Sequence, residues 1–294
     1  MNEMKRHTCV TVGTFDGVHR GHQAVLQTLL SESRRRGLEP MVITFANHPL
    51  AVIDPRRAPG RIMEVADEVR ILESRGVSVR VLEFDAAMMG TTAAGWISIM
   101  KEQYGADAIV MGYDNTFGCD GIGLSIAGYR RLSEEAGVDL VSVPAIAGIS
   151  SSAIRKSVEA GDVDSAASML GRPFYLKGTV IHGDAIGRTI GFPTANIRVA
   201  SGMLVPAFGV YAARVSLVDD KIPAVVNVGV RPTVTSASEL RIEAHLIDWA
   251  GDLYGRTIRV DFIERIRGER KFPSLEALRE AIADDTDSAL RLVK

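Results

Sequence analysis

"VTVGTFDGVHRGH", residues 10–22, starts as an apolar strand and passes through glycine into what has the features of a helix start. In an open parallel sheet, ligands bind beyond the carboxyl ends of the strands, where the next helix presents backbone N–H groups and the positive end of its dipole. Gly13 and Gly21 let the backbone approach an anion closely, and Phe15 and Asp16 lie between them. We therefore expect these four residues to form part of a phosphate-binding site.

Two histidines, His19 and His22, occupy positions i and i+3 on the opening turn of the expected helix, so their side chains can point the same way. Imidazole N–H groups can donate hydrogen bonds to phosphate oxygens whose charge grows in a transition state. Taken singly, each histidine fits a solvated or capping residue better than a phosphate ligand. Their combination with the glycines favours a phosphate site.

The chain up to about residue 150 alternates short strand patterns with longer helical patterns. Strand patterns occupy residues 9–15, 41–45, 77–84, 106–112 and 139–145, and helical patterns occupy residues 22–37 and 91–105. This alternation predicts a parallel sheet with helices on its faces, in a Rossmann-like α/β domain.

The pattern changes after residues 151–171, which have a helical pattern interrupted at Gly161. Strands separated by Gly, Pro and Asp follow at residues 175–184, 209–219, 222–230, 241–249 and 256–266. They predict a small antiparallel β-barrel, and residues 274–293 predict a terminal helix with Ser274 as its N-cap. We therefore divide the chain into an α/β domain, residues 1–171, and a β domain, residues 172–294.

Composition limits the class of partner. The 34 Lys and Arg nearly balance the 36 Asp and Glu, so the charge does not favour a nucleic-acid backbone or an anionic membrane surface. Two cysteines are too few for a disulfide framework, and no stretch has the pattern of a signal peptide or a membrane span. We expect a cytoplasmic monomer or weak homo-oligomer that acts on small molecules, with no nucleic-acid or membrane partner.

The second half contains its own candidate phosphate and metal site in "KGTVIHGDAIGRTIGFPTANI", residues 177–197. Gly183 and the basic Arg188 belong to a glycine-containing flap that suits a polyphosphate. Thr194 and Asn196 are two residues apart, so on an extended segment they face the same side. Their oxygens are acceptable ligands for Mg²⁺ when ATP phosphates and water complete its coordination. The pattern alone also fits an ordinary turn.

Four strings carry a resemblance to a known family: "GTFDGVHRGH" at residues 13–22, "TFANHP" at 44–49, "GYDNTFG" at 112–118 and "ISSSAIR" at 149–155. Together they resemble the bacterial bifunctional riboflavin kinase/FMN adenylyltransferase family, the FAD synthetases. "GRTIGFPTAN" is similar to the riboflavin kinase signature, and the resemblance extends over essentially the whole chain. It implies that the barrel makes FMN from riboflavin and ATP, and that the α/β domain makes FAD from FMN and a second ATP.

In the adenylyltransferase half, the resemblance implies that His19 and His22 stabilise charge on the α-phosphate and the leaving pyrophosphate. Arg155 would bind phosphate oxygens through its planar guanidinium, and Ser151 and Ser152 would donate hydroxyl hydrogen bonds. A surface arginine and an N-cap serine cluster remain the alternative interpretations. The flavin-binding residues that the resemblance implies are Asn47, His48, Asp114 and Asn115 in this half, and Arg231 in the barrel.

In the kinase half, the riboflavin hydroxyl must lose its proton as it attacks the γ-phosphate. Strand alternation in "RIEAHLIDW", residues 241–249, places Ile242, Ala244 and Leu246 on the core face and Glu243 on the other. A solvated strand carboxylate would show the same pattern. The resemblance selects Glu243 as the catalytic base, Thr194 as a phosphate and metal ligand, and Mg²⁺ as the cofactor.

Departures from the family pattern keep other interpretations open. Asn47 stands where the second motif usually has proline, and Asn115 and Thr116 replace an aromatic and a basic residue of the third. Val69 stands where the helix after the second motif usually has lysine. The main alternative is a riboflavin kinase whose N-terminal domain is impaired or differently specific. A nucleotidyltransferase of another class and a flavin-binding regulator without turnover are the remaining ones.

Overall fold

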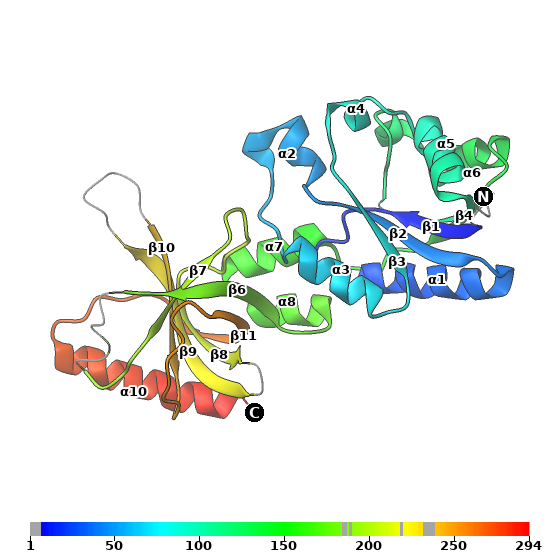
Figure 1. The fold of residues 1–294 in the computed structure, drawn as a ribbon. Coiled ribbons are helices and arrows are strands. Elements are labelled where there is room, and N and C mark those ends of the chain that lie inside the picture. Colours follow the sequence, from blue (N-terminus) through cyan, green and yellow to red (C-terminus); the bar gives the residue numbers. More distant parts are fainter. Residues whose placement is uncertain are drawn as a thin grey trace. The chain divides into compact units, whose positions relative to one another are not determined.

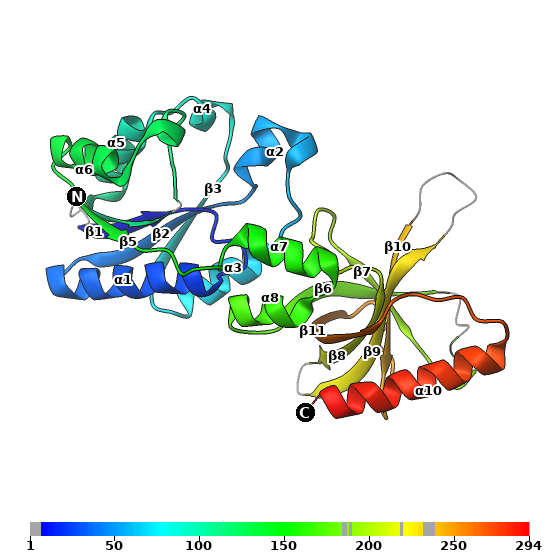
Figure 2. The same ribbon diagram turned by 180° about the vertical axis from the view of Figure 1, so that it is seen from behind.

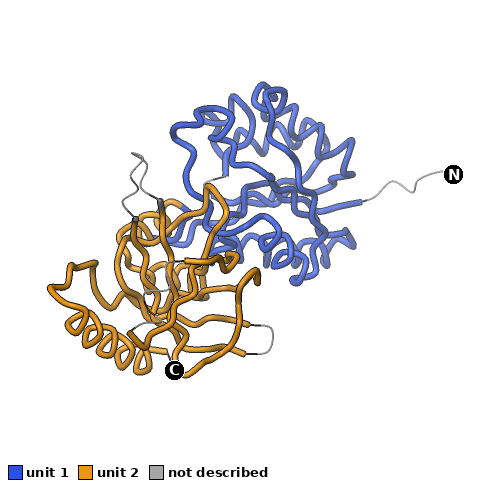
Figure 3. Tube along the Cα trace, turned by 60° about the vertical axis from the view of Figure 1, so that its left-hand side comes forward, with its two compact units in different colours: residues 1–151 blue, residues 152–294 orange. Residues whose placement is uncertain are grey.

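The computed structural model describes residues 7–113, 115–183, 187, 190–217, 220–231 and 239–293, except for the side chains of Arg231 and Glu239. The chain forms two compact units, residues 1–151 and 152–294 (Figure 3). The helical residues that follow 151 thus belong to the second unit. The predicted domain boundary after residue 171 stays a prediction.

The first unit is built on a parallel five-stranded sheet with the order β3-β2-β1-β4-β5. Its strands are β1 (Thr8–Val12), β2 (Glu39–Phe45), β3 (Ser78–Leu82), β4 (Ala106–Gly112) and β5 (Asp139–Val143). Every residue of β1 is buried, as expected for a central strand that is covered on both faces. The predicted α/β domain with a parallel sheet is confirmed.

Helices cover both faces of this sheet. The larger ones are α1 (Arg20–Arg36), α3 (Val65–Glu73), α5 (Ala93–Tyr104) and α6 (Ile126–Glu135); the shorter ones are α2 (Pro49–Ile53), η1 (Pro55–Arg57), α4 (Ala86–Met89) and η2 (Gly121–Gly123). Helices α1 and α3 lie on one face, and α5 and α6 lie on the other (Figures 1 and 2). Trp96 and Ile97 of α5 pack into the core against alternate residues of the central strands, such as Val10 and Ile109.

The second unit is a closed antiparallel barrel with the strand order β10-β7-β6-β11-β8-β9. Its strands are β6 (Phe174–Ile181), β7 (Ala195–Val199), β8 (Gly209–Ser216), β9 (Lys221–Arg231), β10 (Glu239–Leu246) and β11 (Thr257–Arg267), and its helices are α7 (Ser151–Ala160), α8 (Val163–Leu170) and α10 (Leu275–Leu292). Helix α8 packs on β6 and β11, and α10 packs on β8, β9 and β11 (Figure 2). The barrel and its terminal helix are as predicted, and Ser274 caps that helix by accepting a hydrogen bond from the N–H of Ala277 at 3.2 Å.

Strand β7 was not among the predicted strands. Its residues alternate between apolar and polar side chains, but the run is only five residues long and only Ile197 is buried, so the local signal for a strand is weak. Four residue pairs join β7 to β6, but only two join it to β10. Long-range pairing therefore makes this segment a strand.

We expect Gly118→Ala to lower the free energy of unfolding of the first unit by about 3 kcal/mol, because backbone strain and overpacking add. Gly118 has a φ of 92°, and a Cβ there would lie 2.6 Å from the Cα of Ala93. Urea unfolding followed by the fluorescence of Trp96, in a Trp249→Phe background, measures the change.

Gly123→Ala is the matched control, since a Cβ at Gly123 meets nothing within 4 Å. Its effect should stay within about 0.5 kcal/mol. Equal effects of the two substitutions would contradict the assigned packing of the loop.

Candidate active sites

The first candidate site lies at the carboxyl edge of the parallel sheet. Strand β1 pairs with β2 on one side and β4 on the other, so the direction in which strands are added reverses between β1 and β4. Ligands of open α/β sheets bind at such a reversal. The segments that follow β1 and β4 meet there, because the side-chain amide of Asn115 donates to the carbonyl of Val12, and a Cβ on Gly13 would lie 3.8 Å from that amide nitrogen.

The loop after β1 has a strained backbone. Phe15 and Val18 both have a φ of 40°, and Gly17 between them has a φ of 84°. Positive φ is rare for a β-branched residue, and such strain persists only where the surroundings enforce it. Here Phe15 and Val18 are buried to 3% and 1% exposure, and the Val18 N–H donates to the Phe15 carbonyl at 2.8 Å.

Asp16 anchors this loop to the rest of the unit. Its carboxylate is buried and accepts hydrogen bonds from the backbone N–H groups of Ile62 and Met63 at 3.0 to 3.2 Å. Hydrogen bonds to a charged acceptor are among the stronger ones in proteins. Asp16 therefore connects the loop to the backbone at Ile62 and Met63. Its predicted contact with phosphate stays a prediction.

His19 is the N-cap of α1, and its Nδ1 accepts a hydrogen bond from the N–H of His22 at 3.3 Å. The two imidazole rings stack with centroids 3.7 Å apart and an angle of 17° between their planes. Phe15 also packs against His22, with ring centroids 5.0 Å apart. The predicted pair is therefore brought together.

Gly21 and Ser151 join this group. A Cβ on Gly21 would lie 3.0 Å from the ring of His19 and 3.9 Å from the carbonyl oxygen of Ile149. The Ser151 hydroxyl donates to the carbonyl of Asp16 at 3.2 Å. The "ISSSAIR" segment thus begins against the histidine loop.

Four other predicted residues of this half, Arg155, Ser152, His48 and Asp114, lie elsewhere in the chain. Arg155 is buried and Ser152 is exposed, and both belong to α7 of the second unit. The His48 ring caps α2 by accepting from the N–H of Leu50 at 3.1 Å. Asp114 lies outside the described residues.

Asn47 connects two loops. Its amide nitrogen donates to the carbonyl of Phe84, and its amide oxygen accepts from the N–H of Phe84, both at 2.8 Å. Proline, which the family motif usually has here, has no side-chain amide to make these bonds. Asn47 and Asn115, which both depart from the family motifs, therefore stabilise loops through hydrogen bonds to the backbone. Their flavin contacts stay predictions.

A buried polar cluster of Glu68, Thr44 and Arg61 was missed by the sequence analysis. Glu68 of α3 is fully buried; its Oε1 accepts from the Thr44 hydroxyl at 2.6 Å, and its Oε2 accepts from Arg61 at 2.9 Å. Burial raises the pKa of the Glu68 carboxyl from its ordinary value of 4.5 to about 8; the charge of Asp16 adds to the rise, while Thr44 and Arg61 oppose it. A glutamate within a helical pattern gives no sequence signal for such burial.

Glu68 should make the stability of the first unit depend on pH. Between about pH 4.5 and 8 the folded state keeps a proton that the unfolded state releases, so the free energy of unfolding falls as pH rises through this window, by up to about 5 kcal/mol. Urea unfolding between pH 5 and 8, followed through Trp96 in the Trp249→Phe background, checks the slope.

In Glu68→Gln this part of the pH dependence should disappear, because glutamine does not titrate. Glu73→Gln, at an exposed position of the same helix, is the control and should keep the wild-type slope. An unchanged slope in Glu68→Gln would show that other groups cause it.

The second candidate site lies where β7 and β10 meet. Their two residue pairs are Glu243 with Asn196 and Ala244 with Ala195. Directly opposite residues of an antiparallel pair share a face, so the Glu243 and Asn196 side chains are neighbours. The Thr194 hydroxyl lies 3.5 Å from Glu243 Oε1. Ile242, Ala244 and Leu246 are buried, as the alternation predicted.

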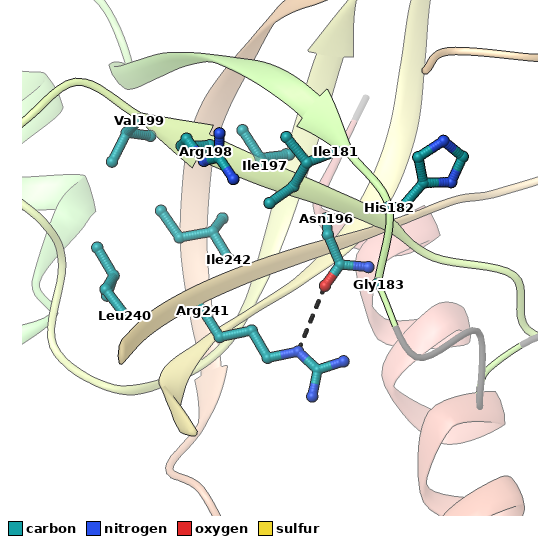
Figure 4. A pocket seen from close by; sticks show the side chains of 10 residues that line it. All are labelled: Ile181, His182, Gly183, Asn196, Ile197, Arg198, Val199, Leu240, Arg241 and Ile242. Carbon is teal, nitrogen blue, oxygen red and sulfur yellow. Dashed lines mark hydrogen bonds between the residues drawn. The ribbon is translucent and has the colours of Figure 1, made fainter. Parts of the chain in front are cut away.

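Arg241, which the sequence analysis missed, lies on the same face. Its Nη2 donates to Glu243 Oε1 at 2.9 Å, and its Nε donates to Asn196 Oδ1 at 3.3 Å (Figure 4). Because Arg241 lies two residues before Glu243 on a strand, the sequence could have indicated that the two side chains share a face. The contact between Arg241 and Asn196 depends on the pairing register of β10 with β7, which the sequence does not show. His245 faces the same way, and its Nδ1 lies 2.9 Å from the Pro193 carbonyl oxygen.

Thr194 lines two cavities of the barrel. One, of about 340 Å³, also contains Glu243 and Asn227 with apolar residues such as Phe192, Phe272 and Ile282. The other, of about 300 Å³, contains Trp249, Leu253 and Tyr254. A hydroxyl at the junction of two cavities is suited to a reaction between two bound molecules.

Two predicted residues of this half are not tested by the geometry. Arg188 lies outside the described residues, and the side chain of Arg231 is not described. Gly183 lies against Asn196, where a Cβ would come within 2.5 Å of the amide carbon. Among the described residues, no group of three or more His, Cys, Asp or Glu could hold a metal ion. No helix in the described ranges is long and apolar enough to cross a membrane.

Gly183→Ala should reduce the phosphorylation of riboflavin that the sequence resemblance implies by about 100-fold, because the new methyl group would displace the Asn196 amide. Conversion of FMN to FAD by the same preparation is the internal control and should be unchanged. Chromatography of the flavin products measures both rates, and an unaltered kinase rate would mean that the Asn196 position is not needed.

Comparison with known proteins assigns each unit a class. A model of the FAD synthetase family matches residues 1–157, and a model of the riboflavin kinase family matches residues 170–293. The strand reversal with its histidine loop and the barrel with its Thr194 and Glu243 cluster are therefore a nucleotidyltransferase fold and a kinase fold in one chain.

Relatives extend over nearly the full length. The bifunctional riboflavin kinase/FMN adenylyltransferase of Escherichia coli (strain K12) is 38% identical, over 97% of this chain and 93% of that protein. The protein of the same description from Bacillus subtilis (strain 168) is 34% identical, over 99% and 94%. The chain belongs to the bifunctional riboflavin kinase/FMN adenylyltransferase family. Membership in this family assigns it two enzymatic activities, those of a riboflavin kinase and an FMN adenylyltransferase.

A solved structure supports the same fold. The crystal structure of a protein described as a macrolide-efflux protein from Streptococcus pneumoniae is 31% identical, covers 97% of this chain and 94% of its own, and superposes with a TM-score of 0.89. The two chains share the arrangement of an α/β unit followed by a barrel.

Proposed function

We propose that two separate residue sets carry the two reactions. Thr194, Asn196 and Glu243 carry transfer of the γ-phosphate of ATP to riboflavin, and the loop of residues 13–22 with Ser151 and Arg155 carries transfer of AMP to FMN. The observation that supports this most is the register of β10 on β7, which sets the candidate base Glu243 opposite the candidate metal ligand Asn196.

In the kinase reaction, the ribityl hydroxyl of riboflavin attacks the γ-phosphorus, Glu243 Oε accepts the hydroxyl proton, and ADP leaves. We assign the flavin to the cavity with Phe192, Phe272 and Glu243, because a flat aromatic ring system suits its apolar walls. ATP is assigned to the cavity with Trp249 and Tyr254. The γ-phosphate would then lie near Thr194, which lines both.

The residues present fit a magnesium ion. Thr194 and Asn196 offer a hydroxyl and an amide oxygen on one face, and the lack of a side chain at Gly183 leaves space against the Asn196 amide. Hard oxygen ligands of this kind, with phosphates and water, suit Mg²⁺. When bound, the ion would supply positive charge to the phosphates of ATP.

In the adenylyl transfer, a phosphate oxygen of FMN attacks the α-phosphorus of ATP and pyrophosphate leaves. The His19 Nδ1 accepts from a backbone N–H, so in the neutral ring the proton is on Nε2, which donates to the developing charge. Gly13 and Gly21 admit the phosphates, and Arg155 adds a permanent positive charge. No residue is covalently modified.

The alternative, a kinase with an impaired N-terminal domain, rests on the departures from the family pattern at Asn47, Asn115 and Val69. The hydrogen bonds of Asn47 and Asn115 to loop backbone support a folded site with changed flavin contacts. We propose that both reactions proceed on small molecules in the cytoplasm, in a monomer or weak homo-oligomer, with Mg²⁺ serving both.

Two substitutions should separate the activities. Glu243→Gln should lower the kinase rate at least 100-fold and leave FAD formation from FMN unchanged, because glutamine cannot accept the proton. His19→Asn should lower FAD formation by a similar factor with little loss of stability, since asparagine is itself a good N-cap.

The assay incubates the full chain with ATP, Mg²⁺ and either riboflavin or FMN, under air and under reductant, and separates the flavins by chromatography. FAD formation by wild type that survives in Glu243→Gln supports two working sites. FMN formation without FAD under both conditions would favour the impaired-domain alternative, and flavin binding without turnover would favour a regulator.

A further inference from the structure

The Arg241 guanidinium bridges two oxygens at the centre of the barrel site. Its Nε lies 3.3 Å from Asn196 Oδ1, and its Nη2 lies 2.9 Å from Glu243 Oε1. Figure 4 shows the side chain extending from β10 toward the Asn196 amide on β7. A permanent cation thus binds both the amide oxygen proposed to hold the metal and the carboxylate proposed as the base.

We propose that Arg241 is a latch that occupies the amide oxygen of Asn196 in the nucleotide-free kinase and must release it before the metal–nucleotide complex binds. This inference rests on the proposed metal role of Thr194 and Asn196. A metal ion at Asn196 Oδ1 would place a second positive charge beside the guanidinium, and like charges at this separation repel. Arg241 and the metal ion therefore compete for the amide oxygen of Asn196.

The surroundings give the latch room to open. Arg241 lines the 340 Å³ cavity that contains Glu243, and it also lines a second cavity of about 350 Å³ on β7 and β10. The second cavity lies where the two strands, paired only at Asn196 and Ala195, have separated (Figure 4). The side chain is 26% exposed, so the guanidinium can leave Asn196 by rotation of its own side chain, without a change in strand pairing.

Arg198 provides a matched control within the second cavity. It carries the same charge on β7 and is exposed, and the described part of the chain shows no bond from it to Asn196 or Glu243. A general electrostatic effect of cavity arginines on metal affinity would appear in both Arg198→Gln and Arg241→Gln. A latch on the amide oxygen would appear only in the second.

The experiment titrates the full chain with Mn²⁺ in the presence of ADP and follows bound Mn²⁺ by electron paramagnetic resonance. The binding that disappears in Asn196→Ala belongs to the kinase site. We expect Arg241→Gln to bind Mn²⁺ at this site at least fivefold more tightly than wild type, with Arg198→Gln unchanged. Arg241→Lys, which keeps the charge but lacks the Nε donor, should lie between wild type and Arg241→Gln.

The titrations distinguish failure of the latch from failure of the metal assignment. Unchanged or weaker Mn²⁺ binding in Arg241→Gln, with the Asn196-dependent site intact, overturns the latch and leaves the proposed function standing. Equal tightening in Arg198→Gln also overturns it. Titrations of wild type and Asn196→Ala that coincide overturn the metal assignment, and the latch with it. Trp249 fluorescence, in a Trp96→Phe background, verifies that the barrel of each variant is folded.

Discussion

Two cross-strand residue pairs, between β10 and β7, are the constraint on which the barrel site depends. They close the barrel, and they set Glu243 opposite Asn196. Because side chains alternate along a strand, a slip of one residue would turn Glu243 into the core and bring Ile242 out. The buried side chains of Ile242, Ala244 and Leu246 prevent that slip, so core packing determines where the polar groups of the site lie.

The loop after β1 is held by a different means. No ladder of strand hydrogen bonds fixes its geometry, and Phe15 and Val18 adopt backbone conformations that are unfavourable by themselves. Burial of these two side chains, and the hydrogen bonds that the Asp16 carboxylate accepts from the N–H groups of Ile62 and Met63, offset that strain. The geometry of the first site is thus fixed by buried side chains of the loop itself and not by strand pairing.

Sequence patterns predicted what depends on local order. Strand alternation gave the faces of β10, the alternation of strands and helices gave the parallel sheet, and Ser274 marked the start of α10. What the patterns missed depends on register or on distant packing. Strand β7 is too short for its alternation to be a strong signal, and its pairing with β6 and β10 defines it. Arg241 reaches Asn196 only in this register, and Glu68 is buried by elements from other parts of the chain. A local pattern carries no information on such contacts.

The capping and phosphate-binding interpretations of His19 are compatible, because an imidazole has two nitrogens. The cap uses Nδ1 as an acceptor from the backbone N–H of His22. That bond leaves the proton of a neutral ring on Nε2, so the cap itself determines which nitrogen can donate. His22 stacks on the same ring and limits its rotation. A serine or aspartate cap would satisfy the helix equally well but would leave no oriented N–H donor, so histidine at this position serves the helix and the proposed chemistry together.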